Sequence, residues 1–141
     1  MIFMTVGANM GIIVYNKLSE DYSMLPNNYY IGRGSILGNP YTHKPLQGTM
    51  AIYHTRNREE AIERYGGYFD LMYEKDSEFR AVVDEIYEKY KKGEDIYFAC
   101  YCKPEPCHGD IILQKLQKRL LREKIKEAKM LRNKNEVGEI L

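Results

Sequence analysis

The chain has 141 residues and a formal net charge of +1, from 21 basic and 20 acidic side chains. This length suits one domain with its own hydrophobic core, and the balanced charge gives no electrostatic reason to expect nucleic acid as a partner. No apolar run approaches a membrane-spanning length and the N-terminal region lacks a signal-peptide pattern, so we expect a cytoplasmic protein that does not bind a membrane.

The first part of the chain predicts short strands joined by loops. Apolar and β-branched runs indicate strands at 2–6, 11–15 and 29–31. Polar residues with little periodicity indicate loops at 17–28 and 41–57.

From Arg58 onward the pattern is helical. Apolar residues at spacings of three and four predict one helix from Arg58, and a second that begins after an N-cap at Ser77 and ends at Gly93. The adjacent Gly66 and Gly67 cost the first helix roughly 1 kcal/mol each. Such a cost suggests that another backbone or a ligand approaches closely there.

The second part continues with a buried strand at 96–102 and a helix that starts near Asp110. The order of elements predicts the α/β class, specifically a single-domain three-layer Rossmann-like sandwich over 1–132, with a small, mostly parallel sheet and flanking helices. Residues 133–141 are expected to form a frayed or disordered tail.

All three cysteines and one histidine lie between this strand and this helix, as Cys100, Cys102, Cys107 and His108. An odd number of cysteines in a chain of this length favours reduced thiols. Three interpretations stay open: a zinc site, a nucleophilic Cys107 activated by the helix start, or buried thiols beside a polar helix start that meets a ligand.

Our expectation is that no metal binds tightly. The paired C-x2-C spacing is missing, the adjacent Cys107 and His108 would have difficulty reaching one ion, and a helical core needs no metal to hold it. Cys107 is then expected to be the most readily alkylated thiol, and no cofactor is expected.

A second candidate site is the glycine-dense segment 32–40. Glycines allow consecutive amides to turn toward one anion, and Arg33 adds a forked donor suited to phosphate. The alternative is a glycine-rich turn with an exposed arginine. The segment matches neither the G-x-G-x-x-G fingerprint nor a P-loop.

Three blocks together carry a family resemblance: Ile31 to Pro40 (IGRGSILGNP), Arg58 to Tyr65 (REEAIERY) and Cys100 to Asp110 (CYCKPEPCHGD). The chain resembles, over roughly 12–121, the bacterial and viral family catalogued as domain of unknown function 4326. The resemblance brings no settled activity. It associates the chain with phage genomes and with nucleotide or NAD-derived metabolites.

Residues and resemblance together predict a protein that binds a phosphate-bearing nucleotide derivative, NAD-like or ADP-ribose-like, as a phage protein that sequesters a nucleotide signal would. The cleft is expected between the glycine-rich loop and the last helix, with Arg33 and His108 both in it. Tyr30 or Tyr41 would stack on the nucleobase of the ligand, and Asp110 would accept a hydrogen bond from a ribose hydroxyl. An enzyme using Cys107, His108 or Asp110, and a metal-stabilised interaction module, remain as alternatives. A homo-oligomer also stays open. The expected ligand-binding residues are Gly32, Arg33, Gly34, Ser35, Gly38, Asn39, Arg58, Cys102, His108, Gly109 and Asp110.

Overall fold

The computed structural model describes residues 11–19, 22 and 24–140, with side chains to 135. The strand expected at 2–6 lies outside these residues. The described elements, in chain order, are β1 (Ile12–Asn16), β2 (Asn28–Tyr30), β3 (Tyr41–Thr42), β4 (Tyr53–His54), α1 (Arg58–Lys75), α2 (Ser77–Lys91), β5 (Ile96–Cys100) and α3 (Gly109–Ile140).

The main sheet has three strands in the order β1-β5-β2, and both pairings are parallel. Phe98 on β5 pairs with Val14 on one side and Tyr29 on the other, so β5 is the central strand, as predicted. It ends at Cys100 rather than Cys102. The Cys100 carbonyl accepts a hydrogen bond from the amide of Lys17, and the chain then leaves the sheet.

A second, two-stranded sheet pairs β3 with β4 in parallel, where the sequence predicted only loop. The Pro40 carbonyl accepts hydrogen bonds from the amides of Ile52 and Tyr53, and the Thr42 carbonyl accepts one from Thr55. Strands of two residues are too short to show an alternating pattern, so the sequence gives no sign of them.

Both predicted helices form, with a correction at one cap. Asp76, not Ser77, is the N-cap of α2: its carboxylate accepts hydrogen bonds from the amides of Glu78 and Phe79. The glycines inside α1 do not serve a close approach. A Cβ at Gly67 would meet nothing within 4 Å, and one at Gly66 would meet only side chains at 3.8 Å or more.

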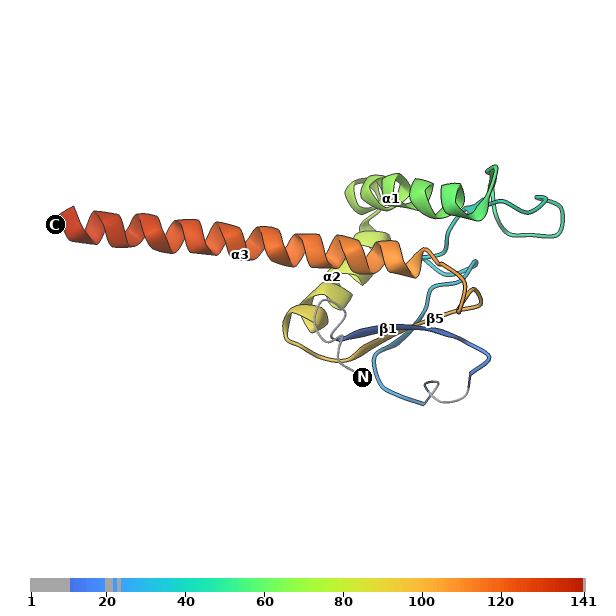
Figure 1. The fold of residues 1–141 in the computed structure, drawn as a ribbon, viewed down its shortest axis with the longest axis horizontal. Helices are drawn as coiled ribbons and strands as arrows, with labels where there is room; N and C mark the ends of the chain where they lie inside the picture. Colours follow the sequence, from blue (N-terminus) through green and yellow to red (C-terminus); the bar gives the residue numbers. More distant parts are fainter. Residues whose placement is uncertain (1–10, 20–21, 23, 141) are drawn as a thin grey trace.

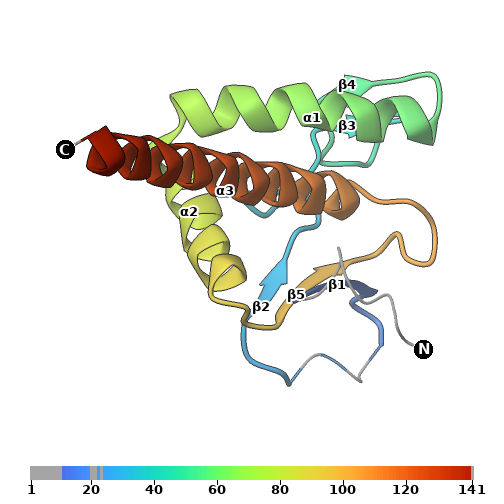
Figure 2. The ribbon, with the colours of Figure 1, turned by 60° about the vertical axis from the view of Figure 1, so that its left-hand side comes forward.

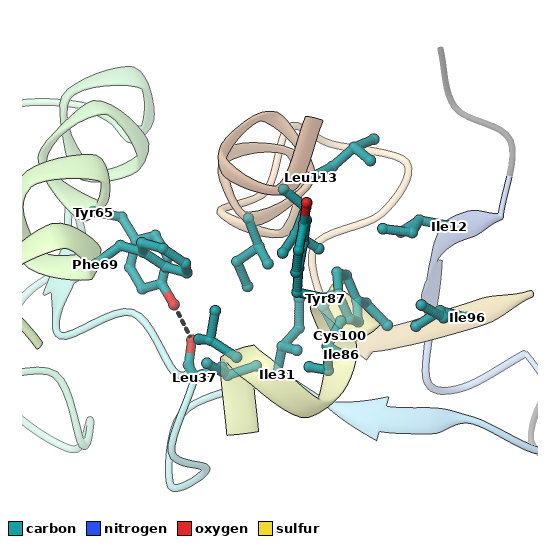
Figure 3. Packing of buried hydrophobic residues seen from close by; sticks show 14 of the residues in the cluster. Ile12, Ile31, Leu37, Tyr65, Phe69, Ile86, Tyr87, Ile96, Cys100 and Leu113 are labelled. Carbon is teal, nitrogen blue, oxygen red and sulfur yellow. Dashed lines mark hydrogen bonds between the residues drawn. The ribbon is translucent and has the colours of Figure 1, made fainter. Parts of the chain in front are cut away.

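The core lies between the sheet and the helices, and all three helices lie on the same side of the sheet in both views (Figures 1 and 2). The α/β class and the small parallel sheet therefore agree with the prediction, whereas this one-sided arrangement differs from the two helical layers of a Rossmann-like sandwich. Figure 3 shows residues from both sheet and helices meeting in one cluster. Its largest fully buried side chains are Tyr65, Tyr87, Phe79, Phe98, Ile31, Ile86, Ile96, Ile112 and Leu116.

Helix α3 begins in the core and projects far beyond the rest of the molecule (Figure 1). Ile112 and Leu116 near its start are buried, whereas every side chain over 124–135 is exposed. Helix continues to Ile140, past the point at 133 where fraying was expected. No helix in the described part of the chain is long and apolar enough to cross a membrane.

Candidate functional site

A cleft of about 390 Å³ opens where the glycine-rich loop, β3, the start of α1 and the segment after β5 come together. This volume lies within the range of about 300–1,000 Å³ that is usual for small-molecule sites. The three blocks singled out in the sequence thus meet at one place, although Arg33 and His108 are 75 positions apart. The lining residues are Tyr30, Gly32, Arg33, Asn39, Tyr41, Thr42, His43, Lys44, Arg58, Ala61, Ile62, Cys100, Tyr101, Cys102, Glu105, Pro106, Cys107 and His108.

One wall of the cleft is the 32–40 loop, which is held by its own polar side chains. The Arg33 guanidinium donates to the carbonyls of Asn39 and Tyr41, at 3.1 and 2.8 Å. The Asn39 amide group donates to the Ala61 carbonyl on α1 and accepts from the Tyr41 amide. Arg33 and Asn39 therefore shape the wall, and only part of the Arg33 guanidinium remains for a ligand.

The amide nest expected in this loop is not formed by Ser35 and Gly38. The Ser35 amide donates to the Gly32 carbonyl and the Gly38 amide donates to the Ser35 carbonyl, each at 3.1 Å, which makes two successive turns. The Ser35 hydroxyl also binds the Gly32 carbonyl. Gly34 has a φ of +94°, which suits glycine, but it does not line the cleft. These glycines build a tight turn.

The cleft is also lined by cations with free donors. The guanidinium of Arg58, at the first position of α1, makes no hydrogen bond or ion pair with any described residue. Lys44 also lines the cleft, and its ammonium has no described partner. The lining residues include three lysine or arginine side chains but only one carboxylate, that of Glu105. The cleft therefore suits an anionic ligand.

The floor of the cleft is a cluster of thiols. The sulfur atoms of Cys100, Cys102 and Cys107 all lie within 4.8 Å of one another, and all three cysteines are free. Cys107 is only 1% exposed, whereas Cys102 is half-buried. Cys107 was expected to be the most readily alkylated thiol, but its side chain is packed in the core, and of the three thiols that line the cleft Cys102 is the most exposed.

These thiols strongly perturb one another. Hydrogen bonds from the Cys102 and Cys107 thiols, together with the backbone amides of Lys103 and Cys102, lower the pKa of Cys100. Its neighbours Cys100 and Cys102, together with burial, raise the pKa of Cys107. Within this cluster the Cys100 thiol loses its proton readily and the Cys107 thiol resists losing its own.

His108 lies beside the thiols and is almost fully buried, with its ring against Tyr65 at a centroid distance of 4.7 Å. Its Nε2 lies 2.7 Å from the Ile31 carbonyl oxygen, so Nε2 carries the proton and donates. Nδ1 is then an unprotonated acceptor, 3.6 Å from the Cys107 sulfur. Burial lowers the pKa of His108, which keeps the ring neutral at physiological pH.

The start of α3 was expected to meet the ligand, but Gly109 and Asp110 do not line the cleft. A Cβ at Gly109 would stand 2.8 Å from Ile31 Cδ1, so this glycine lets α3 pack on the sheet. The Asp110 carboxylate binds Lys103 Nζ at 3.0 Å and accepts from the Cys107 amide. Both residues fix the helix start.

Several cleft residues were missed by sequence reasoning, namely Thr42, His43, Lys44, Tyr101, Glu105 and Pro106. Thr42, His43 and Lys44 lie in a segment expected to be plain loop, whereas Tyr101, Glu105 and Pro106 lie inside the third block but were not assigned to the site. Of the residues expected to bind a ligand, the cleft contains Gly32, Arg33, Asn39, Arg58, Cys102 and His108, and it excludes Gly34, Ser35, Gly38, Gly109 and Asp110.

The fold and the cleft define a class: a small α/β domain whose central strand delivers a thiol cluster to a positively charged cleft. The model of one family, described as "Domain of unknown function (DUF4326)", matches residues 14–118, and the chain belongs to that family. No curated protein and no solved structure matches the chain.

Proposed function

We propose that this protein binds a phosphate-bearing nucleotide derivative, such as an ADP-ribose-like or NAD-like molecule, in the 390 Å³ cleft. The observation that carries the proposal is the pair of cations that line the cleft, Arg58 and Lys44, which have no described ionic partner. A phosphate would supply the missing negative charge, and the arginine fork matches its oxygen atoms.

Aromatic residues beside these cations supply a surface for a base. Tyr30 and Tyr41 both line the cleft. Tyr30 contacts Tyr101 at a centroid distance of 6.0 Å, and Tyr41 contacts Tyr53 at 5.1 Å, so both rings are held in place. Fixed tyrosine rings provide contact area for a planar ligand at a small cost in conformational entropy.

We infer that the ligand is held rather than converted, as by a cytoplasmic protein that sequesters a nucleotide signal. The three candidate catalytic groups support this inference. Cys107 is buried, His108 donates its only ring proton to the Ile31 carbonyl, and Asp110 is paired with Lys103 outside the cleft. The Cys107 thiol and the Asp110 carboxylate are thus not free to act on a ligand, and His108 has no ring proton left to donate into the cleft.

The test is calorimetry with ADP-ribose, AMP and inorganic phosphate, followed by chromatography of the recovered ligand. Arg58→Ala should weaken nucleotide binding by about 1.5–3 kcal/mol, the loss of hydrogen bonds to a charged group. Arg64→Ala is the matched control, since this arginine is exposed on the same helix and does not line the cleft. Equal affinities for the wild type and Arg58→Ala would refute the phosphate role of Arg58. Recovery of a chemically altered ligand would show that the protein is an enzyme and not only a binding protein.

A further inference from the structure

The thiol cluster at the floor of the cleft has the composition and geometry of a zinc site. We propose that Cys100, Cys102 and Cys107 bind Zn²⁺ through their sulfur atoms, and that His108 Nδ1 is the fourth ligand. This inference does not depend on the nature of the nucleotide ligand.

Distances among the sulfur atoms fit one tetrahedral ion. With Zn–S bonds near 2.3 Å, the edge between two sulfur atoms of a tetrahedron is about 3.8 Å. The three sulfur atoms of the cluster already lie within 4.8 Å of one another, so small side-chain rotations bring them to this edge. Cys100 ends β5, Cys102 lies in the loop two residues later and Cys107 lies just before α3, so the site lies between a strand and a helix.

His108 lies close to one of the sulfur atoms, that of Cys107, which it follows directly in the chain. It is not among the residues whose ligand atoms all lie within 4.8 Å of one another, so its ring has to shift toward the other two sulfur atoms to complete the tetrahedron. A tetrahedral zinc with bonds near 2.3 Å to sulfur and 2.05 Å to nitrogen places these two ligand atoms about 3.6 Å apart. The Cys107 sulfur and His108 Nδ1 are 3.6 Å apart. Neighbouring positions therefore do not prevent the two side chains from reaching one ion, which removes a main reason to expect no metal.

Hydrogen bonds with neighbouring groups suit both His108 and Cys107 to metal binding. A zinc-bound histidine usually donates its other ring N–H to a backbone carbonyl or carboxylate, and His108 Nε2 donates to the Ile31 carbonyl at 2.7 Å. The Gly109 amide points at the Cys107 sulfur at 3.4 Å, which is where a thiolate gains from a hydrogen bond. Both contacts exist in the structure without any ion.

With zinc bound, all three sulfur atoms would be thiolates, so binding would release the protons that the cluster still carries, while His108 already presents a neutral nitrogen. The resulting site would carry one net negative charge, and Arg33, Arg58 and Lys44 around the cleft offset it. Of the ligands, Cys102 is the most exposed, so the ion would enter from the cleft.

The experiment uses the full-length chain, expressed with added zinc and analysed for metal by mass spectrometry. We expect stoichiometric zinc. After removal by a chelator, Co²⁺ should restore the folded signal and give the thiolate-to-cobalt charge-transfer absorption of tetrahedral sulfur ligation. Removing the ion should also speed the alkylation of Cys102 by iodoacetamide. Absence of both zinc and the cobalt band in the wild-type chain would overturn the proposal without reference to any variant.

Variants then assign the ligands. Cys102→Ser and His108→Gln should each lower the affinity for Co²⁺ by at least about tenfold. This is the smallest loss usually seen when a residue that only hydrogen-bonds to a metal ligand is replaced. His43→Gln is the matched control, because it changes a cleft histidine outside the cluster. Arg58→Ala should keep the metal, which separates this proposal from the one on phosphate. An unchanged cobalt spectrum in His108→Gln would exclude histidine as a ligand.

Discussion

Gly38 determines how tightly the 32–40 loop can turn at the wall of the cleft. A Cβ there would stand 2.7 Å from the Gly32 carbonyl oxygen and 3.1 Å from Arg33 Cα, and both are backbone atoms. Backbone cannot rotate away as a side chain does, so the loop itself would have to move. The two hydrogen bonds that the Arg33 guanidinium makes to loop carbonyls depend on the same turn.

Gly38→Ala should therefore lower the free energy of unfolding by about 1–3 kcal/mol, the usual cost of an overpacked site. Gly67→Ala is the contrasting change, because an added Cβ meets nothing within 4 Å in the middle of α1. It should raise the free energy of unfolding by up to about 1 kcal/mol through helix propensity. Urea denaturation of both variants measures this difference, and effects of equal sign would contradict it.

At the scale of elements, one polar contact joins all three helices. Tyr73 of α1 donates its hydroxyl hydrogen to the Asp84 carboxylate of α2 at 2.6 Å, and Arg119 of α3 donates to the same carboxylate at 2.9 Å. Burial alone would raise the pKa of Asp84, but these two hydrogen bonds outweigh it and hold the pKa below its usual range.

Because the pKa of Asp84 is lower in the folded than in the unfolded protein, the ionised carboxylate adds to the free energy of unfolding. This contribution is complete above the unfolded-state pKa of about 3.9 and is lost as the pH falls through the folded-state pKa. Asp84→Asn should then lower stability at pH 7 by about 1 kcal/mol or less, because the pair is partly exposed, and should matter little in strong acid. Urea denaturation at pH 7 and at pH 2.5 checks this. Asp70→Asn, which loses only the outer pair with Lys115, is the control. A loss of stability that is the same at both pH values would contradict the linkage.

The sequence predicts the elements that are long enough to show a periodic apolar pattern, and it misses the short elements that are defined by local contacts. Helices α1 and α2 follow from their apolar stripes, and β5 follows from its apolar run between two helices. The two-residue strands β3 and β4 have no period to detect. Asp76 and Ser77 are both good caps, so only the observed bonds decide between them.

For the cleft, sequence reasoning succeeds in bringing distant blocks together and fails in assigning roles. Parallel strands place the residues after β2 and β5 at one sheet edge, which is why Arg33 and His108 meet. Sequence does not reveal that Arg33 and Asn39 bind carbonyls of their own loop, or that Asp110 turns to Lys103. The same polar side chain can bind either a group of the protein or a ligand, and only the fold shows which of the two it binds.

At the scale of the molecule, α3 has two halves with different support. The first packs on the core through residues such as Ile112 and Leu116. Over 124–135 every side chain is exposed, so this half buries no side chain against the rest of the described structure. Isolated helices of this length are marginal in water. The protein therefore combines a cooperative body with a helical extension of low stability.

A chain truncated after Lys126 should keep the melting temperature of the body and its ligand affinity, while losing part of its helical circular dichroism. Leu116→Ala, in the packed half, should instead lower the free energy of unfolding by about 2–5 kcal/mol because it opens a cavity in the core. A clear drop in melting temperature on truncation would show that the extension contributes to the body after all.

The projecting half of α3 also governs how the molecule moves in solution. Residues 121–140 span about 30 Å as a straight helix, whereas a compact chain of 141 residues has a radius of gyration of only about 14 Å. Rotation about the helix axis is then faster than end-over-end tumbling, and friction on the extension slows the latter. Because of this projection, the rotational diffusion of the body is anisotropic, although the body that carries the cleft is compact.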